Sequence, residues 1–175
     1  MQKETRNICN YYHYWLHSEI ISDLDAKRHN FSVFCVNIHH DFNLGSIVRN
    51  CNAFLAKQIF IYGNKRFDRR GCVGTNHYEK IVHLPIDTDL ETFFKQFYTV
   101  GIDNVENSKS IETYEWQADK HVLMLFGEEQ LGISKDILDM CNDIIFIRMQ
   151  GSIRSLNVGC ASAIAMYDYC RKVVK

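Results

Sequence analysis

The chain has 175 residues, of which 46% are hydrophobic and 23% are charged. These values fit one compact soluble domain and exclude a disordered chain. No apolar run reaches the roughly 18 residues that a membrane-spanning helix requires, and the first residues carry no secretory signal. The net charge of −1 excludes a basic surface overall, so any contact with nucleic acid must come from a local patch.

The seven cysteines include no CxxC pair and show no His/Cys spacing typical of a zinc site. We therefore expect reduced thiols in a cytosolic protein. No partnered histidine motif accompanies them, so none is expected to act as a nucleophile. His39 and His40 are adjacent but lack a third ligand, and we expect no metal.

Hydrophobic periodicity predicts the elements in chain order. Apolar residues at helical spacing over residues 4–28 predict an N-terminal amphipathic helix that packs on the main domain. Apolar runs predict strands over residues 31–38, 58–63, 81–84, 99–105, 121–127 and 143–149. Helices are predicted over residues 43–56, 87–97, 134–141 and 155–174, the last two with Ser134 and Ser155 as N-caps. A basic loop over residues 65–78 and a polar stretch over residues 106–119 are predicted to be irregular.

Strands that are apolar throughout and alternate with helices predict an α/β fold, with a mostly parallel sheet covered by helices on both faces. Ligands bind beyond the carboxyl ends of the strands in such sheets. We expect residues 1–30 to form an N-terminal helical extension and residues 31–175 to form the single main domain.

Three segments at predicted strand ends carry polar residues and glycines. The first is NLGSIVRN, residues 43–50, and by itself it indicates a helix capped by Asn43 with a surface arginine. The second is LFGEEQLGIS, residues 125–134, whose glycines let backbone approach a ligand closely. No lysine follows its second glycine, so it is not a phosphate-binding P-loop. The third is IRMQGSIRSLNVG, residues 147–159, which leads into a helix rich in small residues.

Taken together, these segments resemble the SpoU/TrmH branch of the SPOUT RNA methyltransferases. That branch has an Asn-x-Gly…Arg helix start, a Gly-x-Glu-x-x-Gly loop and a Ser-Leu-Asn-Val helix entry, and all three occur here in order. Asp41 and Arg148 stand where the family has proline, and Gly159 stands where it has serine. These departures bear on loop shape and leave the reacting side chains in place.

The resemblance implies a deep trefoil knot in the C-terminal third, a homodimer and S-adenosyl-L-methionine as cofactor, released as S-adenosyl-L-homocysteine, with no metal. It implies that the cofactor is held by the backbone around Gly127, Ile147, Met149 and Leu156, with Asn107 in addition. It further implies that the catalytic surroundings consist of Arg49, Glu129, Ser155 and Asn157, supported by Asn43.

The implied reaction transfers a methyl group from sulfonium sulfur to a ribose 2′-oxygen of RNA. A guanidinium has a pKa above about 12 and is a poor base, so we expect Arg49 to bind an RNA phosphate instead. Ser155 and Asn157 are expected to bond the ribose or orient Arg49, and Glu129 to orient its neighbours.

RNA contacts are expected from basic residues, with two aromatic residues available for stacking. The basic residues are Lys65, Arg66, Arg69, Arg70, Arg148 and Arg154, and the aromatic ones are Phe67 and Tyr78. The third motif is most similar to tRNA guanosine methyltransferases that act on the D-loop, so we expect a cytoplasmic tRNA enzyme.

Other readings stay open: an rRNA 2′-O-methyltransferase, methylation of a base or a protein by the same fold, and a non-catalytic knotted module that binds cofactor or RNA. A Rossmann-type nucleotide enzyme is disfavoured, because no GxGxxG follows the first strand.

Overall fold

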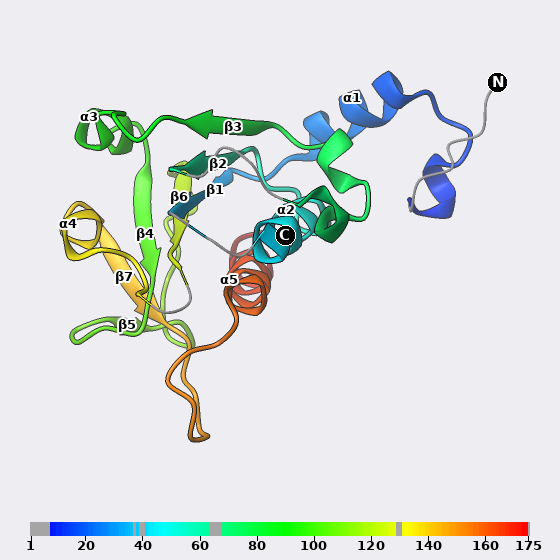
Figure 1. Cartoon of the computed structure of the whole chain (residues 1–175). Helices are drawn as coiled ribbons and strands as arrows, with labels where there is room; N and C mark the ends of the chain where they lie inside the picture. Colours follow the sequence, from blue (N-terminus) through cyan, green and yellow to red (C-terminus); the bar gives the residue numbers. More distant parts are fainter. Residues whose placement is uncertain (1–7, 37, 39–40, 64–67, 129–130, 175) are drawn as a thin grey trace.

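The computed structural model describes residues 8–36, 38, 41–63, 68–128 and 131–174. Within these residues, one sheet has the strand order β3-β2-β1-β6-β4-β7-β5, and every pairing between its strands is parallel (Figure 1). The strands are β1 (Phe31–Val36), β2 (Ile59–Tyr62), β3 (Ile81–Leu84), β4 (Tyr98–Ile102), β5 (Lys109–Ser110), β6 (Val122–Phe126) and β7 (Asp143–Phe146). The helices are α1 (His17–Lys27), α2 (Asp41–Ala53), α3 (Leu90–Phe94), α4 (Lys135–Leu138) and α5 (Val158–Val173), and the 3-10 turns are η1 (Asn10–Tyr12), η2 (Arg69–Cys72) and η3 (Thr75–His77). The predicted α/β class is confirmed.

Helices cover both faces of the sheet, and the strand sequences explain why. Side chains alternate along β1, so that Phe31 and Val33 join the core beneath α2 and α5, whereas Phe34 and Val36 join the core beneath α3 and α4 (Figure 1). Every residue of β1 and β6 is therefore buried, which accounts for their continuous apolar runs. Across the described residues, the structure contains no helix with the length and apolar character that a membrane crossing requires.

The predicted N-terminal helix is wrong in its start and extent. Helix α1 begins only at His17, after the turn η1, and residues 1–7 lie outside the described part of the chain. The carboxylate of Glu19 accepts a hydrogen bond from the backbone N–H of Leu16 at 2.7 Å. This bond satisfies an N–H at the helix start and sets the boundary there.

The predicted packing of α1 on the main domain is confirmed. Ile20 and Leu24 are buried in one cluster with Tyr78 of the main domain. Beyond the last turn, the Arg28 side chain is only 3% exposed and forms an ion pair with the fully buried Glu79 at 2.8 Å. Asp25 bonds the same guanidinium at 2.8 Å. Burial raises the pKa of Glu79 even with Arg28 beside it.

Two predicted helix caps are wrong. Asn43 is the third residue of α2, which begins at Asp41, so it does not cap that helix. Helix α5 is capped by Asn157 rather than Ser155, because the Asn157 Oδ1 accepts a hydrogen bond from the Cys160 N–H at 3.3 Å. Asn and Ser suit a cap equally well, and the loop before α5 simply continues for two more residues.

The two helices on the other face are shorter than predicted. Helix α3 has five residues and α4 has four. Asp89 caps α3 by accepting a hydrogen bond from the Thr92 N–H at 3.2 Å. Ser134 occupies the cap position of α4, as predicted, but its side chain makes no capping bond.

Candidate functional site

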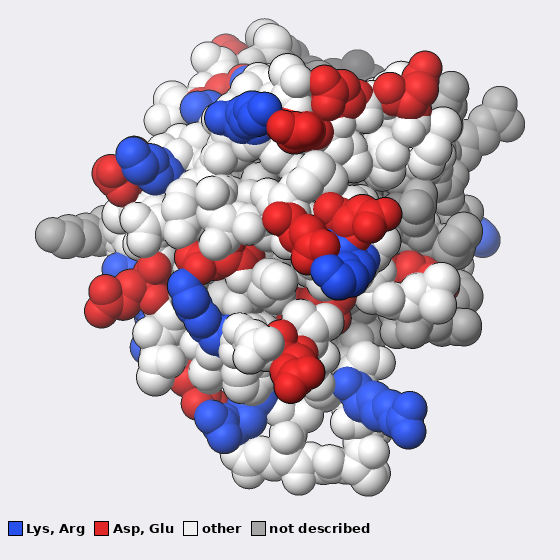
Figure 2. Space-filling view, turned by 90° about the vertical axis from the view of Figure 1, so that its left-hand side faces the viewer, with Lys and Arg blue, Asp and Glu red and all other residues white. Residues whose placement is uncertain are grey.

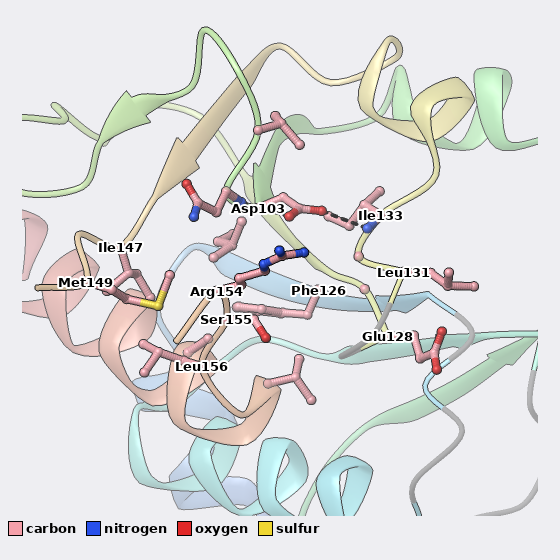
Figure 3. Close-up of a pocket in the computed structure, with 17 residues that line it drawn as sticks. Asp103, Phe126, Glu128, Leu131, Ile133, Ile147, Met149, Arg154, Ser155 and Leu156 are labelled. Carbon is pink, nitrogen blue, oxygen red and sulfur yellow. Dashed lines mark hydrogen bonds between the residues drawn. The ribbon is translucent and has the colours of Figure 1, made fainter. Parts of the chain in front are cut away.

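A cavity of about 360 Å³ lies at the carboxyl edge of the sheet, where three loops meet (Figure 3). Its walls come from residues 103–105 after β4, residues 127, 128 and 131–133 after β6, and residues 147, 149 and 154–156 before α5. Phe126, the last residue of β6, contributes to the lining. This is the edge at which parallel α/β sheets bind their ligands.

Four of the five residues predicted to surround a cofactor line this one cavity. They are Gly127, Ile147, Met149 and Leu156. The fifth, Asn107, is exposed and is not among the residues that line it. The structure thus brings the second and third motifs together, while the binding role of these residues stays a prediction.

The loop after β6 closes so tightly that glycine is required at both of its ends. A Cβ atom on Gly127 would lie 2.3 Å from the carbonyl carbon and oxygen of Gly132. Gly132 itself has a φ of +68°, in the left-handed region that favours glycine. Its N–H donates to the Glu128 carbonyl at 2.8 Å and closes the turn. The two glycines of the motif are therefore explained by backbone packing.

Asp103 lines the cavity and was missed by the sequence analysis. Its Oδ2 accepts a hydrogen bond from the Ile133 N–H at 2.7 Å, and its Oδ1 accepts one from the Asn104 N–H at 2.8 Å (Figure 3). The predicted strand ran through Val105 and enclosed Asp103, but β4 ends at Ile102. Two polar residues, Asp103 and Asn104, directly follow Ile102, and they were the sequence signal that could have predicted this earlier strand end.

The starts of α2 and α5 are joined beside the cavity. The Asn157 side-chain amide donates a hydrogen bond to the Asn43 Oδ1 at 2.9 Å. Asn157 is flanked by Leu156 and Val158, which both line the cavity. The first and third motifs therefore meet at the rim of the cavity, although they lie more than a hundred residues apart in the chain.

Small residues let the two helices approach closely. A Cβ atom on Gly159 would lie 2.9 Å from the Ser46 Cβ. The Asn50 side chain donates to the Gly159 carbonyl at 2.8 Å and to the Ser162 hydroxyl at 2.9 Å. The small residues at the beginning of α5 therefore pack against α2, a contact that the sequence did not specify.

The predicted catalytic residues are distributed around this junction. Ser155 is exposed and lines the cavity. Arg49 is an exposed residue of α2 and makes no hydrogen bond or ion pair with any residue that the structure describes. Glu129 lies outside the described residues. The catalytic roles stay predictions.

Turn η2 brings part of the basic loop against α2. A Cβ atom on Gly45 would lie 2.7 Å from the Gly71 Cα, so the two backbones touch. Arg69 and Arg70 are exposed on this turn. Arg70 is paired with Asp68. The predicted RNA-binding residues Lys65 and Arg66, and the predicted stacking residue Phe67, lie outside the described residues.

The prediction that Tyr78 stacks on RNA is wrong. Tyr78 is only 4% exposed and packs with Ile20 and Leu24 of α1. The sequence showed an aromatic residue beside a basic loop but not the helix that covers it.

The remaining two predicted RNA contacts lie on the third loop. Arg148 pairs with Glu112 at 3.4 Å and remains more than half exposed. Arg154 lines the cavity and lies between Asp103 and Ser155 in the close-up view (Figure 3).

The face that carries α3 and α4 shows basic and acidic side chains intermixed, with no patch of one sign (Figure 2). This face therefore offers no basic patch for RNA.

All seven cysteines lie in the described segments and are free. Cys9 and Cys160 are exposed, whereas the other five are buried or half-buried. Burial raises the pKa of Cys72, the last residue of η2, to about 11, so this thiol is protonated at neutral pH. The described residues include no group of three or more His, Cys, Asp or Glu side chains arranged to hold a metal.

Comparisons with known proteins confirm the resemblance seen in the sequence. Residues 30–167 match the family model described as the SpoU rRNA Methylase family. A relative from Aquifex aeolicus (strain VF5), named tRNA (guanosine(18)-2'-O)-methyltransferase, is 26% identical over 155 residues, which cover 85% of this chain and 72% of the relative.

Solved structures share the fold. The A. aeolicus TrmH/SpoU tRNA modifying enzyme has a TM-score of 0.77 at 24% identity, covering 89% of this chain and 83% of that one. The SpoU methyltransferase AviRb from Streptomyces viridochromogenes, in complex with AdoMet, has a TM-score of 0.71 at 24% identity and covers 82% of this chain. This chain spans only 58% of AviRb. With its matching motifs, fold and family model, the chain belongs to the SpoU rRNA methylase family.

Proposed function

We propose that the protein is an S-adenosylmethionine-dependent RNA 2′-O-ribose methyltransferase that acts on tRNA, with a D-loop guanosine as the target. One observation carries the proposal: Asn157 both flanks the cavity and bonds Asn43, so the cofactor cavity and the first motif share one rim. The name of the A. aeolicus relative supports tRNA guanosine as the substrate.

The residues around the cavity fit S-adenosylmethionine. Ile147, Met149 and Leu156 lie together on one side of the cavity and offer the apolar surface that an adenine ring needs (Figure 3). The close approach of Gly127 to Gly132 leaves backbone rather than side chain facing the ligand. The AdoMet complex of AviRb supports this assignment.

The bound cofactor supplies a methyl group on a sulfonium, and the chain has to align the acceptor hydroxyl with it. Alignment of two reactants contributes roughly 7–11 kcal/mol to a barrier reduction. Arg49, exposed on α2, holds an RNA phosphate through its forked guanidinium and thereby places the neighbouring 2′-OH. Ser155 and Asn157, on the rim, bond the ribose or orient Arg49.

RNA reaches the rim over η2 and α2 in this proposal. Arg69 and Arg70 sit on a turn that touches α2 at Gly45, so their charges lie on the same side as Arg49. Phosphate contacts of this kind position a nucleic acid without reading its sequence. Arg148 adds a contact from the third loop.

The domain organisation and the oligomeric state are proposed from the same family resemblance. We propose residues 1–30 as an N-terminal extension, residues 31–175 as the methyltransferase domain with its C-terminal trefoil knot, and a cytoplasmic homodimer. The exposed apolar side chains Ile164 and Tyr167 of α5, 39% and 59% exposed, supply a face for the second subunit. Light scattering of the purified protein tests the dimer.

Ribosomal RNA is the second candidate substrate, because the family model is described by rRNA methylation. The test incubates the protein with labelled S-adenosylmethionine and separate unmodified tRNA and rRNA, then maps the methyl group by nucleoside mass spectrometry. We expect a 2′-O-methylated guanosine in tRNA. Label in rRNA would favour the second candidate, and cofactor binding without transfer would favour a non-catalytic module.

Arg49→Lys tests the role of the guanidinium in the same assay. Lysine keeps the charge but loses the fork, so we expect turnover to fall at least tenfold. Near-full turnover with unchanged RNA affinity would exclude a forked phosphate contact.

A further inference from the structure

We propose that Asp103 is a positioning residue for the cofactor: its carboxylate fixes Gly132 and Ile133, at the end of the loop after β6, in the arrangement that binds S-adenosylmethionine. This inference rests on the proposed function. It concerns a side chain that none of the three family motifs contains.

Asp103 joins three parts of the cavity. Its backbone N–H donates to the Ile145 carbonyl of β7 at 3.0 Å, which fixes the residue at the end of the sheet. Its two carboxylate oxygens accept the N–H groups of Ile133 and Asn104 at 2.7 and 2.8 Å. A carboxylate that accepts backbone N–H groups forms hydrogen bonds roughly twice as strong as neutral ones.

The Asp103 carboxylate also lies close to the backbone of Gly132. A Cβ atom on Gly132 would lie 2.5 Å from the Asp103 Oδ2, so the glycine is needed for this contact as well as for its positive φ. Leu131, which directly precedes Gly132, is 84% exposed. Asp103 thus holds the end of the loop at Ile133, next to the wall formed by Gly127 and Gly132 (Figure 3).

Asp103→Asn tests the role of the carboxylate without changing the size or the packing of the side chain. An asparagine of the same shape has one acceptor oxygen, so its NH2 group must face one of the two backbone N–H groups. The loss of one charge-assisted bond predicts a roughly tenfold weaker Kd for S-adenosylhomocysteine, measured by calorimetry. The N–H that then faces the NH2 group, that of Ile133 or that of Asn104, should exchange with solvent faster in the variant, and tRNA affinity should stay within about twofold of wild type.

Asp139→Asn is the matched control. Asp139 is an exposed carboxylate just after α4 that pairs with Lys135 at 2.6 Å, and it does not line the cavity. This variant should bind S-adenosylhomocysteine like the wild type. Unchanged cofactor affinity in Asp103→Asn, or unchanged exchange at both N–H groups, would overturn the proposal.

Gly132→Ala supplies a second test that does not depend on the folding of Asp103→Asn. The new methyl group meets the carboxylate, so cofactor affinity should fall at least tenfold, and the loss should be smaller in an Asp103→Ala background. Equal losses in both backgrounds would mean that the carboxylate does not act through the loop. If wild-type protein bound S-adenosylhomocysteine but transferred no methyl group to RNA, the proposed function alone would fail.

Discussion

Gly45→Ala tests whether the basic turn η2 truly rests on α2. Alanine within a helix is intrinsically favoured over glycine by about 1 kcal/mol. Here its Cβ would lie 2.7 Å from the Gly71 Cα and 2.8 Å from the Gly71 carbonyl carbon, well inside ordinary contact. Overpacking of this kind costs about 1–3 kcal/mol, and backbone atoms on both sides have no rotamer that relieves it. We therefore expect a net loss of about 1 kcal/mol in the free energy of unfolding, together with displacement of η2.

Urea unfolding measures the loss, and tRNA binding measures the displacement. We expect weaker tRNA binding in Gly45→Ala and near-normal affinity for S-adenosylhomocysteine, because Gly45 does not line the cavity. Gly151→Ala is the control, since a Cβ there meets nothing within 4 Å. If Gly45→Ala were as stable as the wild type or more stable, helix propensity would have won and the close contact with Gly71 would be refuted.

Three further predictions concern stability. Arg28→Met leaves the carboxylate of Glu79 buried without its cation, so urea unfolding should show a loss of about 3–5 kcal/mol; a loss below about 1 kcal/mol would contradict the structure. Asn157→Ala removes the cap on the Cys160 N–H and should cost about 1 kcal/mol, whereas Asn157→Asp should retain the cap, and equal stability of the two variants would count against it. Burial lowers the pKa of His121, so its contribution to stability is present above its ordinary pKa of about 6.5 and is lost as the pH falls through the lowered value. The free energy of unfolding, measured at about pH 7.5 and about pH 5.5, should therefore fall more between these two pH values in wild type than in His121→Gln.

The strands that are buried on both faces of the sheet could be predicted from the sequence because their hydrophobic pattern is local. The apolar runs of β1 and β6 fill both cores, and no helix pattern competes there. Helix ends were less well predicted, since Ser155 and Asn157 are equally good caps and only the path of the loop decides between them.

The site was predictable where it depends on motifs and not where it depends on distant contacts. Gly127 and Asn157 belong to recognisable segments, and the structure places both at one cavity rim. The contact between Gly45 and Gly71 joins two segments that have no shared pattern in the sequence. The same holds for the hydrogen bond that the Ile133 N–H donates to Asp103, which lies 30 residues earlier in the chain.

A crystal structure of the protein with S-adenosylhomocysteine tests the central claim most directly. The account predicts the ligand in the cavity between Gly127 and Leu156, with its sulfur toward the rim at which Asn157 meets Asn43 and with the Arg49 guanidinium turned toward that rim. A ligand bound elsewhere, or an Arg49 side chain directed away from Asn157 in every subunit arrangement, would contradict it.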